Sequence, residues 1–474
     1  MAPPNRAIFC LADVEAATGG AIRAGEKLLP LDGVSTDSRQ LAAGNLFVAL
    51  RGESFDGHRF VAAAAAGGAG AAVVERGFVP AEPLPAGFGL VEVEDTLAAL
   101  GALARVHRRR FPQLKVGAIT GSNGKTTTKE LAAAVFTAAF GETLATAGNL
   151  NNEIGVPLTL LRLGSGHAAA AVEMGMNHPG EIARLAAIAE PDAGLVTCAQ
   201  PVHLEGLGSV EAVAKAKGEL YHGLPRGGVA VANLADPRTT AEARASGRTV
   251  LTYGGPEHTE ADVRLLRIAS HDRRGLAFEV SFRGGPAAFV RIPLVGLHNA
   301  ENACAALALG LALGGEPDRM LEGLVRARGF SRRLELKSAP GGVTVVDDCY
   351  NANPASMLAA LRTARALAGE GRVVALLGDM FELGGLEEAG HREVGAAAAA
   401  AKVAGLVAFG SRARWIAEEA KSRGVETICT TEAPDEALAW LRSHLREGDL
   451  LIAKASRGTR LERIVDPLVA GEKA

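Results

Sequence analysis

Short apolar runs separated by helix-length amphipathic segments recur through the middle of the chain. They include KVGAIT (115–120), AAAAVEMG (168–175), AGLVTCA (193–199) and GVAVANLAD (228–236). Segments such as HPGEIARLAAIAE (178–190) lie between them and have the spacing of an amphipathic helix. Strands that alternate with helices in this way are typical of a parallel sheet covered by helices. The pattern therefore predicts repeated βα units.

The pattern changes after residue 260. Residues 261–296 alternate apolar and polar positions around a Gly-Gly turn, which predicts antiparallel strands at the edge of the sheet. A helix is expected over 298–314, and a second alternation begins beyond 329 with the strands VTVVDDCY (343–350) and RVVALLGDM (372–380). This second alternation predicts another nucleotide-fold-like α/β domain.

The chain of 474 residues is too long for one compact core. We predict an α/β protein with three domains. These are residues 1–112, a central domain with a parallel sheet like that of P-loop ATPases (113–328), and a Rossmann-like C-terminal domain (329–474). The first domain closes with the basic run RVHRRRFPQ (105–113), interpreted as a solvated helix end before Pro112.

Composition and charge exclude several classes of function for this protein. A formal charge of -3 and a pI of about 6.4 give no general attraction for nucleic acid or membranes. The five cysteines are scattered and form no CxxC pair, which favours a reducing cytosol over a disulfide framework. The N-terminus is a poor signal peptide, and the Ala/Gly-rich runs are too short to span a bilayer. We expect a cytoplasmic monomer that binds small ligands, with neither nucleic-acid binding nor membrane insertion.

The segment TGSNGKTTTKE (120–130) predicts a phosphate-binding loop between a strand and a helix. Backbone N–H groups of the turn and the helix N-terminus would converge on phosphate oxygens. Ile119 stands where the strict GxxxxGK[ST] pattern needs glycine, so the loop has the shorter form GxxGK[ST]. The nucleotide-binding candidates are Gly121, Ser122, Asn123, Gly124, Lys125, Thr126 and Thr127. Lys125 would supply a positive charge and Thr126 a hydroxyl for Mg²⁺.

Further candidates follow the neighbouring strands. Glu173 ends an apolar strand beside the loop strand, where a carboxylate could hold Mg²⁺ or cap the following helix. His203 follows the next strand and is either a ligand or a structural histidine. Lys215 and Lys217 lie on the next predicted helix, and taken alone each is interpreted as a solvated lysine, because an ammonium group cannot bind a cation.

Polar groups of the remaining segments suit nucleotide or substrate recognition. Asn299 and Asn302 are one turn apart and could recognise an adenine edge, although Asn299 could equally cap its helix. Asp347 and Asp348 end a strand and could hold a ribose hydroxyl or a metal. Near the C-terminus Lys454 and Arg457 could bind a substrate carboxylate. A purely structural role is an open alternative for each.

Taken together, these motifs resemble the Mur ligase family, the ATP-dependent peptide synthetases of bacterial cell-wall assembly. The resemblance extends over nearly the whole chain, through STDSR, LFVALRGESFDGH, TGSNGKTTTKE, GNLNNEIGVPLTLL, EMGMNHPGEI, HLEGLGSVEAVAKAKGE, GLHNAENACAA, DDCYNANPASM and LGDMFELG. It implies three domains that bind a UDP-sugar, bind ATP, and close over both. Within the family, NNEIGVP, MGMNHPGEI, YNANPASM and LGDMFELG are most similar to the member that adds D-Ala-D-Ala to UDP-MurNAc-tripeptide.

The resemblance also implies a reaction for peptidoglycan synthesis that forms ADP. The peptide carboxylate attacks the γ-phosphate of ATP, and the amine of D-Ala-D-Ala attacks the resulting acyl phosphate. Two Mg²⁺ ions are expected, held by Thr126, Glu173, His203 and Lys217. The lysine matching Lys217 is carbamylated in the family, which gives it an anionic metal-binding group. Lys125, Lys217 and His203 are the catalytic candidates.

Other roles follow by motif position. The resemblance implies that Asn299 and Asn302 lie near adenine and that Arg333 and Asp348 reach ATP on domain closure, with Arg332 as the alternative arginine. The predicted substrate contacts are Ser35, Thr36, Asp37, Ser38 and Arg39 for the uridine diphosphate, Asn151 and Asn152 for the sugar or peptide, and Asn351, Lys454 and Arg457.

The sequence argues against three alternative assignments. The ligase that adds the third amino acid usually has a DNPR motif, which is absent from the third domain. Folylpolyglutamate synthetase lacks an equivalent of residues 1–112. A non-catalytic nucleotide-binding protein does not account for Lys125, Glu173, His203 and Lys217 occurring together. The identity of the third peptide residue is not encoded in any of the motifs.

Overall fold

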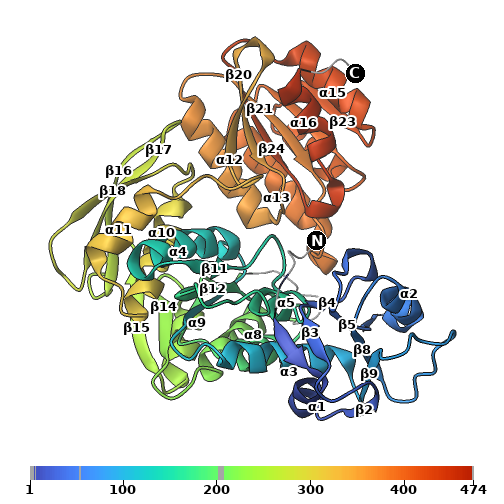
Figure 1. The fold of residues 1–474 in the computed structure, drawn as a ribbon. Helices are drawn as coiled ribbons and strands as arrows, with labels where there is room; N and C mark the ends of the chain where they lie inside the picture. Colours follow the sequence, from blue (N-terminus) through green and yellow to red (C-terminus); the bar gives the residue numbers. More distant parts are fainter. Residues whose placement is uncertain (1–4, 6, 53–54, 201–207, 472–474) are drawn as a thin grey trace.

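Three sheets, each with its own helices, follow one another along the chain (Figure 1). The computed structural model describes residues 5, 7–52, 55–200 and 208–471. The parts of the chain built on the three sheets are named here the first, central and third units. Their boundaries at residues 112 and 328 remain predictions.

The first unit has the strand order β2-β9-β8-β5-β4, in which only the β2-β9 pair is antiparallel. These strands are β2 (Ala21–Ala24), β4 (Val34–Ser35), β5 (Leu46–Val48), β8 (Ala71–Glu75) and β9 (Gly89–Val93). Two short antiparallel pairs accompany them, β1 (Ile8–Cys10) with β3 (Pro30–Asp32) and β6 (Arg51–Gly52) with β7 (Phe55–Asp56). The helices are α1 (Leu11–Thr18), α2 (Val61–Ala66) and α3 (Thr96–Arg109).

The central unit contains the predicted parallel sheet, with the order β11-β12-β10-β13-β14-β15-β16-β17-β18. Its strands are β10 (Lys115–Thr120), β11 (Thr143–Ala145), β12 (Ala169–Glu173), β13 (Ala193–Val196), β14 (Val229–Asn233), β15 (Thr249–Gly254), β16 (Val263–Asp272), β17 (Gly275–Phe282) and β18 (Ala288–Ile292). Its helices are α4 (Lys125–Phe140), α5 (Gly155–Leu160), α6 (Glu181–Ala189), α8 (Val210–His222), α9 (Pro237–Ala245), α10 (His298–Ala312) and α11 (Pro317–Val325).

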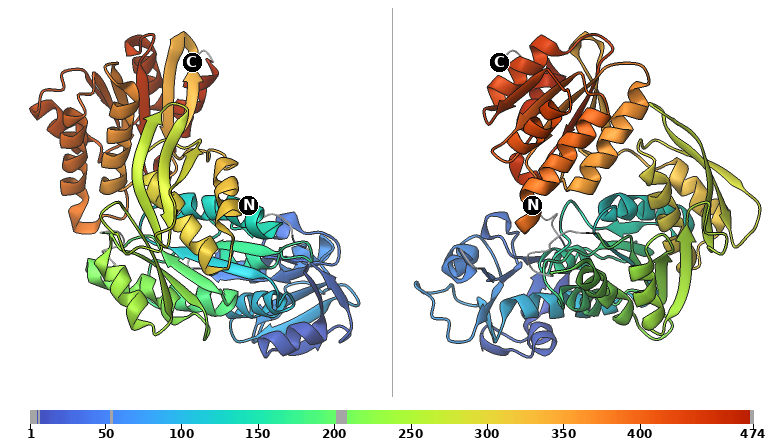
Figure 2. Two further views of the ribbon diagram at one scale, coloured as in Figure 1. Left: turned by 90° about the vertical axis from the view of Figure 1, so that its left-hand side faces the viewer. Right: turned by 180° about the vertical axis from the view of Figure 1, so that it is seen from behind.

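The alternating segment after residue 260 forms the antiparallel edge of this sheet, as expected from its pattern. Strand β17 pairs antiparallel with both β16 and β18. Both views in Figure 2 show these strands projecting from the central unit and reaching upward beside the third unit. The parallel strands β10, β12 and β13 lie at the centre, so their carboxyl ends meet at one sheet edge.

The third unit has the order β19-β20-β24-β21-β22-β23, parallel except for the β19-β20 pair. Its strands are β19 (Glu335–Ala339), β20 (Val343–Asp348), β21 (Val373–Gly378), β22 (Gly405–Phe409), β23 (Ile428–Thr431) and β24 (Leu450–Lys454). Its helices are α12 (Pro354–Ala368), α13 (Glu387–Ala400), α14 (Arg414–Ser422), α15 (Pro434–His444) and α16 (Glu462–Ala470).

The first and central units share one hydrophobic core. Leu100 and Leu103 of α3 belong to the same buried cluster as Ile182 and Leu185 of α6. Gly101 permits this packing, because a Cβ atom there would lie 2.8 Å from Cδ1 of Ile188. The first unit is therefore held against the central unit by apolar packing.

The basic run at the end of α3 is exposed at Arg105, Arg109 and Arg110, as predicted, but Arg108 is buried, and for that residue the prediction was wrong. Arg108 is 7% exposed and donates to the carbonyl oxygens of Ala189 and Glu190 at 3.1 and 3.3 Å. Arg105 and Arg109 form ion pairs with the Glu190 carboxylate. The arginines bind the free carbonyl oxygens and the carboxylate at the C-terminal end of α6. Sequence periodicity could not reveal these contacts, because the two helices are distant in the chain.

Within the described part of the chain, no helix is long and apolar enough to cross a membrane.

Candidate active site

A cleft of about 960 Å³ opens between the central and third units. The central unit contributes the carboxyl ends of β10, β12 and β13 and the start of α10. The third unit contributes the segments after β20, β21 and β24. In an α/β sheet the strand ends near the point where the connections reverse are the usual ligand site.

The phosphate loop has the predicted strand-loop-helix geometry. β10 ends at Thr120, and α4 begins at Lys125 after Gly124, whose φ is 81°. Gly121 has a φ of 146°, and a Cβ atom there would lie 1.8 Å from Oγ1 of Thr197. Only glycine fits that position without moving β13. The loop leaves the first N–H groups of α4 pointing into the cleft, where they can bind an anion.

Lys125 lies over this loop. Its Nζ donates to the carbonyl oxygen of Gly121 at 2.7 Å. Burial lowers the pKa of Lys125, whereas the negative charge of Glu173 raises it. The ammonium group is held by a single short backbone contact and can turn to a phosphate oxygen at little cost.

Glu173 ends β12 beside the loop and is 1% exposed. Its Oε1 accepts a hydrogen bond from Nδ2 of Asn151 at 2.8 Å, and its Oε2 has no partner among the described residues. The carboxylate does not cap the following helix, α6, whose N-cap position is Gly180. An unpaired buried carboxylate oxygen costs free energy unless a cation or a donor joins it. Glu173 therefore fits a Mg²⁺ ligand.

Lys217 lies on α8 and is 2% exposed, whereas Lys215 on the same helix is exposed. Burial, aided by the positive charge of Lys125, lowers the pKa of Lys217 to about 7. Within the described ranges, no hydrogen bond or ion pair involves its Nζ. The interpretation of Lys217 as a solvated lysine was therefore wrong, because its side chain is buried. Sequence spacing could not separate the two lysines by burial.

Of the other two expected metal ligands, the structure describes Thr126 but not His203. His203 lies outside the described residues, so its position stays a prediction. Among the residues that the structure describes, no three His, Cys, Asp or Glu side chains come together as a metal site. Thr126 lies at the start of α4, and its Oγ1 accepts a hydrogen bond from Nη2 of Arg333 at 2.8 Å.

Asn299 and Asn302 lie side by side in the first turn of α10. Asn299 does not cap the helix, because the N-cap position is Leu297 and Nδ2 of Asn299 donates to the carbonyl oxygen of Val295 at 2.7 Å. Asn302 donates to Asn299 and accepts a bond from the hydroxyl of Thr128 on α4. Both asparagines line the cleft, and their bonds fix the orientation of the two amide groups.

The two consecutive arginines at the junction point to different units. Arg333 reaches Thr126 of the central unit and stacks over the ring of Tyr350 at 4.2 Å. Arg332 instead forms an ion pair with Asp466 of α16 at 2.8 Å, inside the third unit. Arg333 thus lines the cleft, whereas Arg332 does not.

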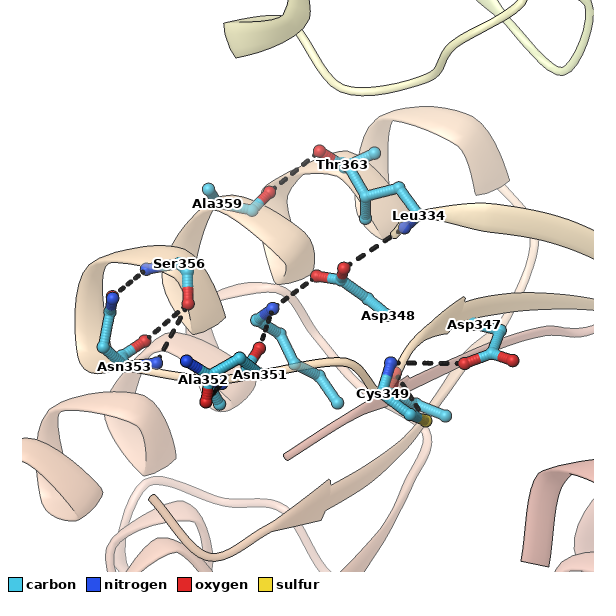
Figure 3. Close-up of polar contacts among 12 residues, drawn as sticks. Leu334, Asp347, Asp348, Cys349, Asn351, Ala352, Asn353, Ser356, Ala359 and Thr363 are labelled. Carbon is cyan, nitrogen blue, oxygen red and sulfur yellow. Dashed lines mark hydrogen bonds and ion pairs between the residues drawn. The ribbon is translucent and has the colours of Figure 1, made fainter. Parts of the chain in front are cut away.

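In the third unit the charged strand ends pair with one another. Lys454 of β24 donates to Oδ2 of Asp348 at 2.5 Å and to the carbonyl oxygen of Asn351 at 2.9 Å. Oδ1 of Asp348 accepts a bond from the Leu334 backbone (Figure 3). Asp347 lies outside the cleft and pairs with Lys337 at 2.6 Å. Asp348, Asn351 and Lys454 line the cleft, as does Arg457, which pairs with Glu462.

The predicted substrate contacts of the first unit lie elsewhere. Ser35, Thr36, Asp37, Ser38 and Arg39 do not line this cleft, and Asp37 forms an ion pair with Arg39 at 2.8 Å. The Arg39 side chain holds the pKa of Asp37 below its usual value. Asn151 and Asn152 do line the cleft, and Oδ1 of Asn152 accepts from the Gly155 backbone at 2.9 Å.

Sequence reasoning missed several residues that the fold brings to the cleft. Tyr350 stacks with Arg333, and Asn353 and Gln200 make side-chain bonds to Asn123. A signal for Asn353 was present, because an asparagine before a proline that opens a predicted helix is typical of an N-cap. Its contact with another unit had no signal in the sequence.

Comparison with known families matches three segments of the chain. Residues 30–108 match the Mur ligase family catalytic domain, residues 119–310 the Mur ligase middle domain, and residues 332–457 the Mur ligase glutamate ligase domain.

Curated relatives extend the match over most of the chain. UDP-N-acetylmuramoyl-tripeptide--D-alanyl-D-alanine ligase of Bacillus subtilis is 37% identical over 93% of both chains. The protein of the same name from Escherichia coli is 40% identical over 82% of this chain and 83% of its own.

Solved structures give the same result. MurF from Acinetobacter baumannii superposes with a TM-score of 0.87 at 32% identity, covering 98% of this chain and 100% of its own. MurF ligase from Thermotoga maritima, solved in complex with ADP, gives a TM-score of 0.79 at 27% identity, covering 92% of this chain and 97% of its own.

Proposed function

The chain belongs to the Mur ligase family, and we infer that it is the ATP-dependent, ADP-forming ligase that joins D-alanyl-D-alanine to UDP-MurNAc-tripeptide. The product is UDP-MurNAc-pentapeptide, a precursor of peptidoglycan. The observation that carries this conclusion is the phosphate loop beside a buried carboxylate with an unpaired oxygen. Such a site is built for a polyphosphate and its counter-cation.

The reaction first activates a carboxylate. An oxygen of the tripeptide carboxylate attacks the γ-phosphorus of ATP, the bond to the β,γ-bridging oxygen breaks, and ADP leaves. Because both reactants are anions, the protein contributes mainly positioning and positive charge. We assign Lys125 and the N–H groups at the start of α4 to the phosphates. Arg333 lies where its guanidinium can join them.

In the second step the amine of D-Ala-D-Ala attacks the acyl carbon. The tetrahedral intermediate collapses, phosphate leaves, and the amine proton passes to solvent or to a nearby base. A water-poor cleft protects the acyl phosphate from hydrolysis, so the third unit must cover it during this step. We propose that Asn351 and Arg457 hold the dipeptide, with Lys454 close to its carboxylate.

We propose two Mg²⁺ ions, held by Thr126, Glu173, Lys217 and His203. Bound there, Mg²⁺ would neutralise the phosphate oxygens and polarise the γ-phosphorus. The unpaired Oε2 of Glu173 supports this proposal.

We further propose that Lys217 is carbamylated. Its unprotonated amine would attack the carbon of CO2 and then lose a proton, which converts a neutral amine into an anion with two oxygen donors. The pKa of about 7 and the absence of a partner among the described residues support this step. An uncharged amine is needed for the attack, and burial supplies it.

The remaining assignments of the family are also proposals. Asn299 and Asn302 would lie against adenine and Asp348 against the ribose. Ser35, Thr36, Asp37, Ser38 and Arg39 would contact the uridine diphosphate, and Asn151 and Asn152 the sugar or peptide. Asn151 would in addition hold Glu173 through its bond to Oε1. We propose a cytosolic monomer.

A phosphate-release assay with a substrate panel tests the function. Release of phosphate is expected only when ATP, UDP-MurNAc-tripeptide and D-Ala-D-Ala are all present. Equal turnover of UDP-MurNAc-dipeptide with a free amino acid would refute the assignment in favour of the preceding ligase. ATP turnover without any acceptor would point to a nucleotide-binding protein of another kind.

A further inference from the structure

Three side-chain amides form a continuous hydrogen-bonded chain across the cleft. Nδ2 of Asn353, in the third unit, donates to Oδ1 of Asn123 in the phosphate loop at 2.7 Å. Nδ2 of Asn123 donates in turn to Oε1 of Gln200 after β13 at 2.5 Å. We name Asn353, Asn123 and Gln200 the amide chain.

The direction of the amide chain is set by the third unit. Asn353 is the N-cap of α12, and its Oδ1 accepts from the backbone N–H of Ser356 at 2.9 Å. The hydroxyl of Ser356 accepts from the backbone N–H of Asn353 at 3.0 Å, which completes a capping box. Because the carbonyl oxygen of the side chain is committed to the cap, its NH₂ group must face the loop.

The other end of the amide chain is fixed to the central sheet. The carbonyl oxygen of Asn123 accepts from Oγ1 of Thr197 at 2.6 Å, and the backbone N–H of Gln200 donates to Oγ of Ser122 at 2.9 Å. Asn123 is therefore held by the segment after β13 on one side and by the N-cap of α12 on the other. Its position depends on where the third unit lies.

The two interfaces of the central unit differ in a way that makes this contact significant. The first unit shares a hydrophobic core with it. The third unit also makes an apolar contact with it, because Val295 belongs to the core cluster of the third unit, but it reaches the phosphate loop through the polar contacts of Asn353 and Arg333. Polar contacts of this kind are readily broken and remade, so each one links the placement of the third unit to the shape of the loop.

We propose that Asn353 is a positioning residue that couples docking of the third unit to the phosphate loop through Asn123. This inference rests on the proposed function, because the loop must bind ATP for the coupling to matter. A loop ordered by the amide chain binds ATP more tightly, and by reciprocity bound ATP favours the docked third unit. Asn353 touches no reacting atom and acts only through Asn123.

The test is Asn353→Ser. Serine caps a helix about as well as asparagine, so α12 is retained, but its hydroxyl is too short to reach Asn123. We expect the KM for ATP to rise about fivefold, which is the size expected for one lost hydrogen bond. We also expect kcat to fall and the melting temperature to stay unchanged. Unchanged kinetics in Asn353→Ser would overturn the proposal.

A double-mutant cycle separates coupling from general damage. If the amide chain acts as a unit, Asn123→Ala combined with Asn353→Ser is no worse than Asn123→Ala alone. Effects that multiply independently would refute the coupling. Asp95→Ser, the same kind of cap exchange on α3 of the first unit, is the control and should leave the KM for ATP unchanged.

The cycle is measured only on protein whose wild type shows phosphate release that depends on D-Ala-D-Ala. A wild type without that activity would refute the proposed function. A fully active wild type with an equally active Asn353→Ser would refute the inference alone.

Discussion

Both sides of the cleft are formed by the ends of parallel strands, but within the described part of the chain the charged side chains at these ends lack an ion partner on one side and form ion pairs on the other. In the central unit, Glu173 at the end of β12 keeps a carboxylate oxygen that is unpaired among the described residues. Lys217, on α8 and outside the residues that line the cleft, is buried without a partner in the same part of the chain. In the third unit, Asp348 and Lys454 pair at 2.5 Å, and Arg457 pairs with Glu462. Unpaired buried groups are costly and are retained where a ligand completes them, whereas paired groups mainly stabilise and position. The central edge is therefore interpreted as the chemical side of the cleft, and the third unit as the side that closes over it.

The largest effect is expected at Lys217. Lys217→Ala should lower kcat about a hundredfold to a thousandfold, because the site loses a group that supports the transferring phosphoryl. Formate or acetate should restore part of the activity if the missing group is an anionic carbamate. The measurement is phosphate release with and without added carboxylate.

Lys215→Ala is the matched control for that experiment. Lys215 lies on the same helix but is exposed, so its removal should change kcat by less than about twofold. Full activity of Lys217→Ala would show that the two lysines are equivalent and would end the carbamate proposal.

Glu173→Gln keeps the shape of the side chain and removes its charge, and we expect it to lower the rate of phosphate release about a hundredfold. The Mg²⁺ concentration for half-maximal activity should rise with it. Asn151→Ala removes only the hydrogen bond to Oε1 of Glu173 and should lower the rate of phosphate release about tenfold. Titrating Mg²⁺ in the phosphate-release assay checks both. An unaltered Mg²⁺ requirement in Glu173→Gln would contradict the metal assignment.

The paired side of the cleft should respond mainly in stability. Lys454→Met leaves the partly buried Asp348 without its charged partner and should cost about 1–2 kcal/mol in the free energy of unfolding, because the backbone N–H of Leu334 still bonds the carboxylate. Both tryptophans, Trp415 and Trp440, lie in the third unit, so their fluorescence reports its urea unfolding. Lys421→Met, at an exposed position of α14, is the control. A loss equal to that of the control would show that the pair contributes nothing.

The smallest effect is a pH dependence of stability. The pKa of Lys217 is lowered to about 7 in the folded protein from an ordinary value of 10.5, so the unfolded state binds more protons between these values. In buffer freed of CO2, where Lys217 carries its free amine, the free energy of unfolding should therefore rise with pH from about 7 toward 10, because the buried amine no longer has to be charged. Lys217→Met should flatten that rise in a series of melting curves, whereas Lys215→Met should keep it. Parallel profiles for both variants would contradict a buried neutral amine.

Much of the fold could be predicted, because local patterns determine local elements. The apolar runs became β10, β12, β13 and β14, and the alternating segment after residue 260 became the antiparallel edge of the same sheet. The loop could be predicted in full, since Gly121 and Gly124 adopt the positive φ values that only glycine accepts readily. At the basic end of α3 only Arg108 was misjudged, because it is buried against the end of a helix some 80 positions away.

By itself the sequence determined the order of strands and helices, the phosphate loop and the identity of the groups at each strand end. These follow from spacing and residue type within short segments. Only the tertiary structure decided that Lys217 and not Lys215 is buried, that Arg333 and not Arg332 faces Thr126, and that Asn353 contacts Asn123. Burial and contacts between units depend on segments that are far apart in the chain. The groups that those segments place around a lysine set the free energy of charging it, and the groups around an amide decide which partner it binds.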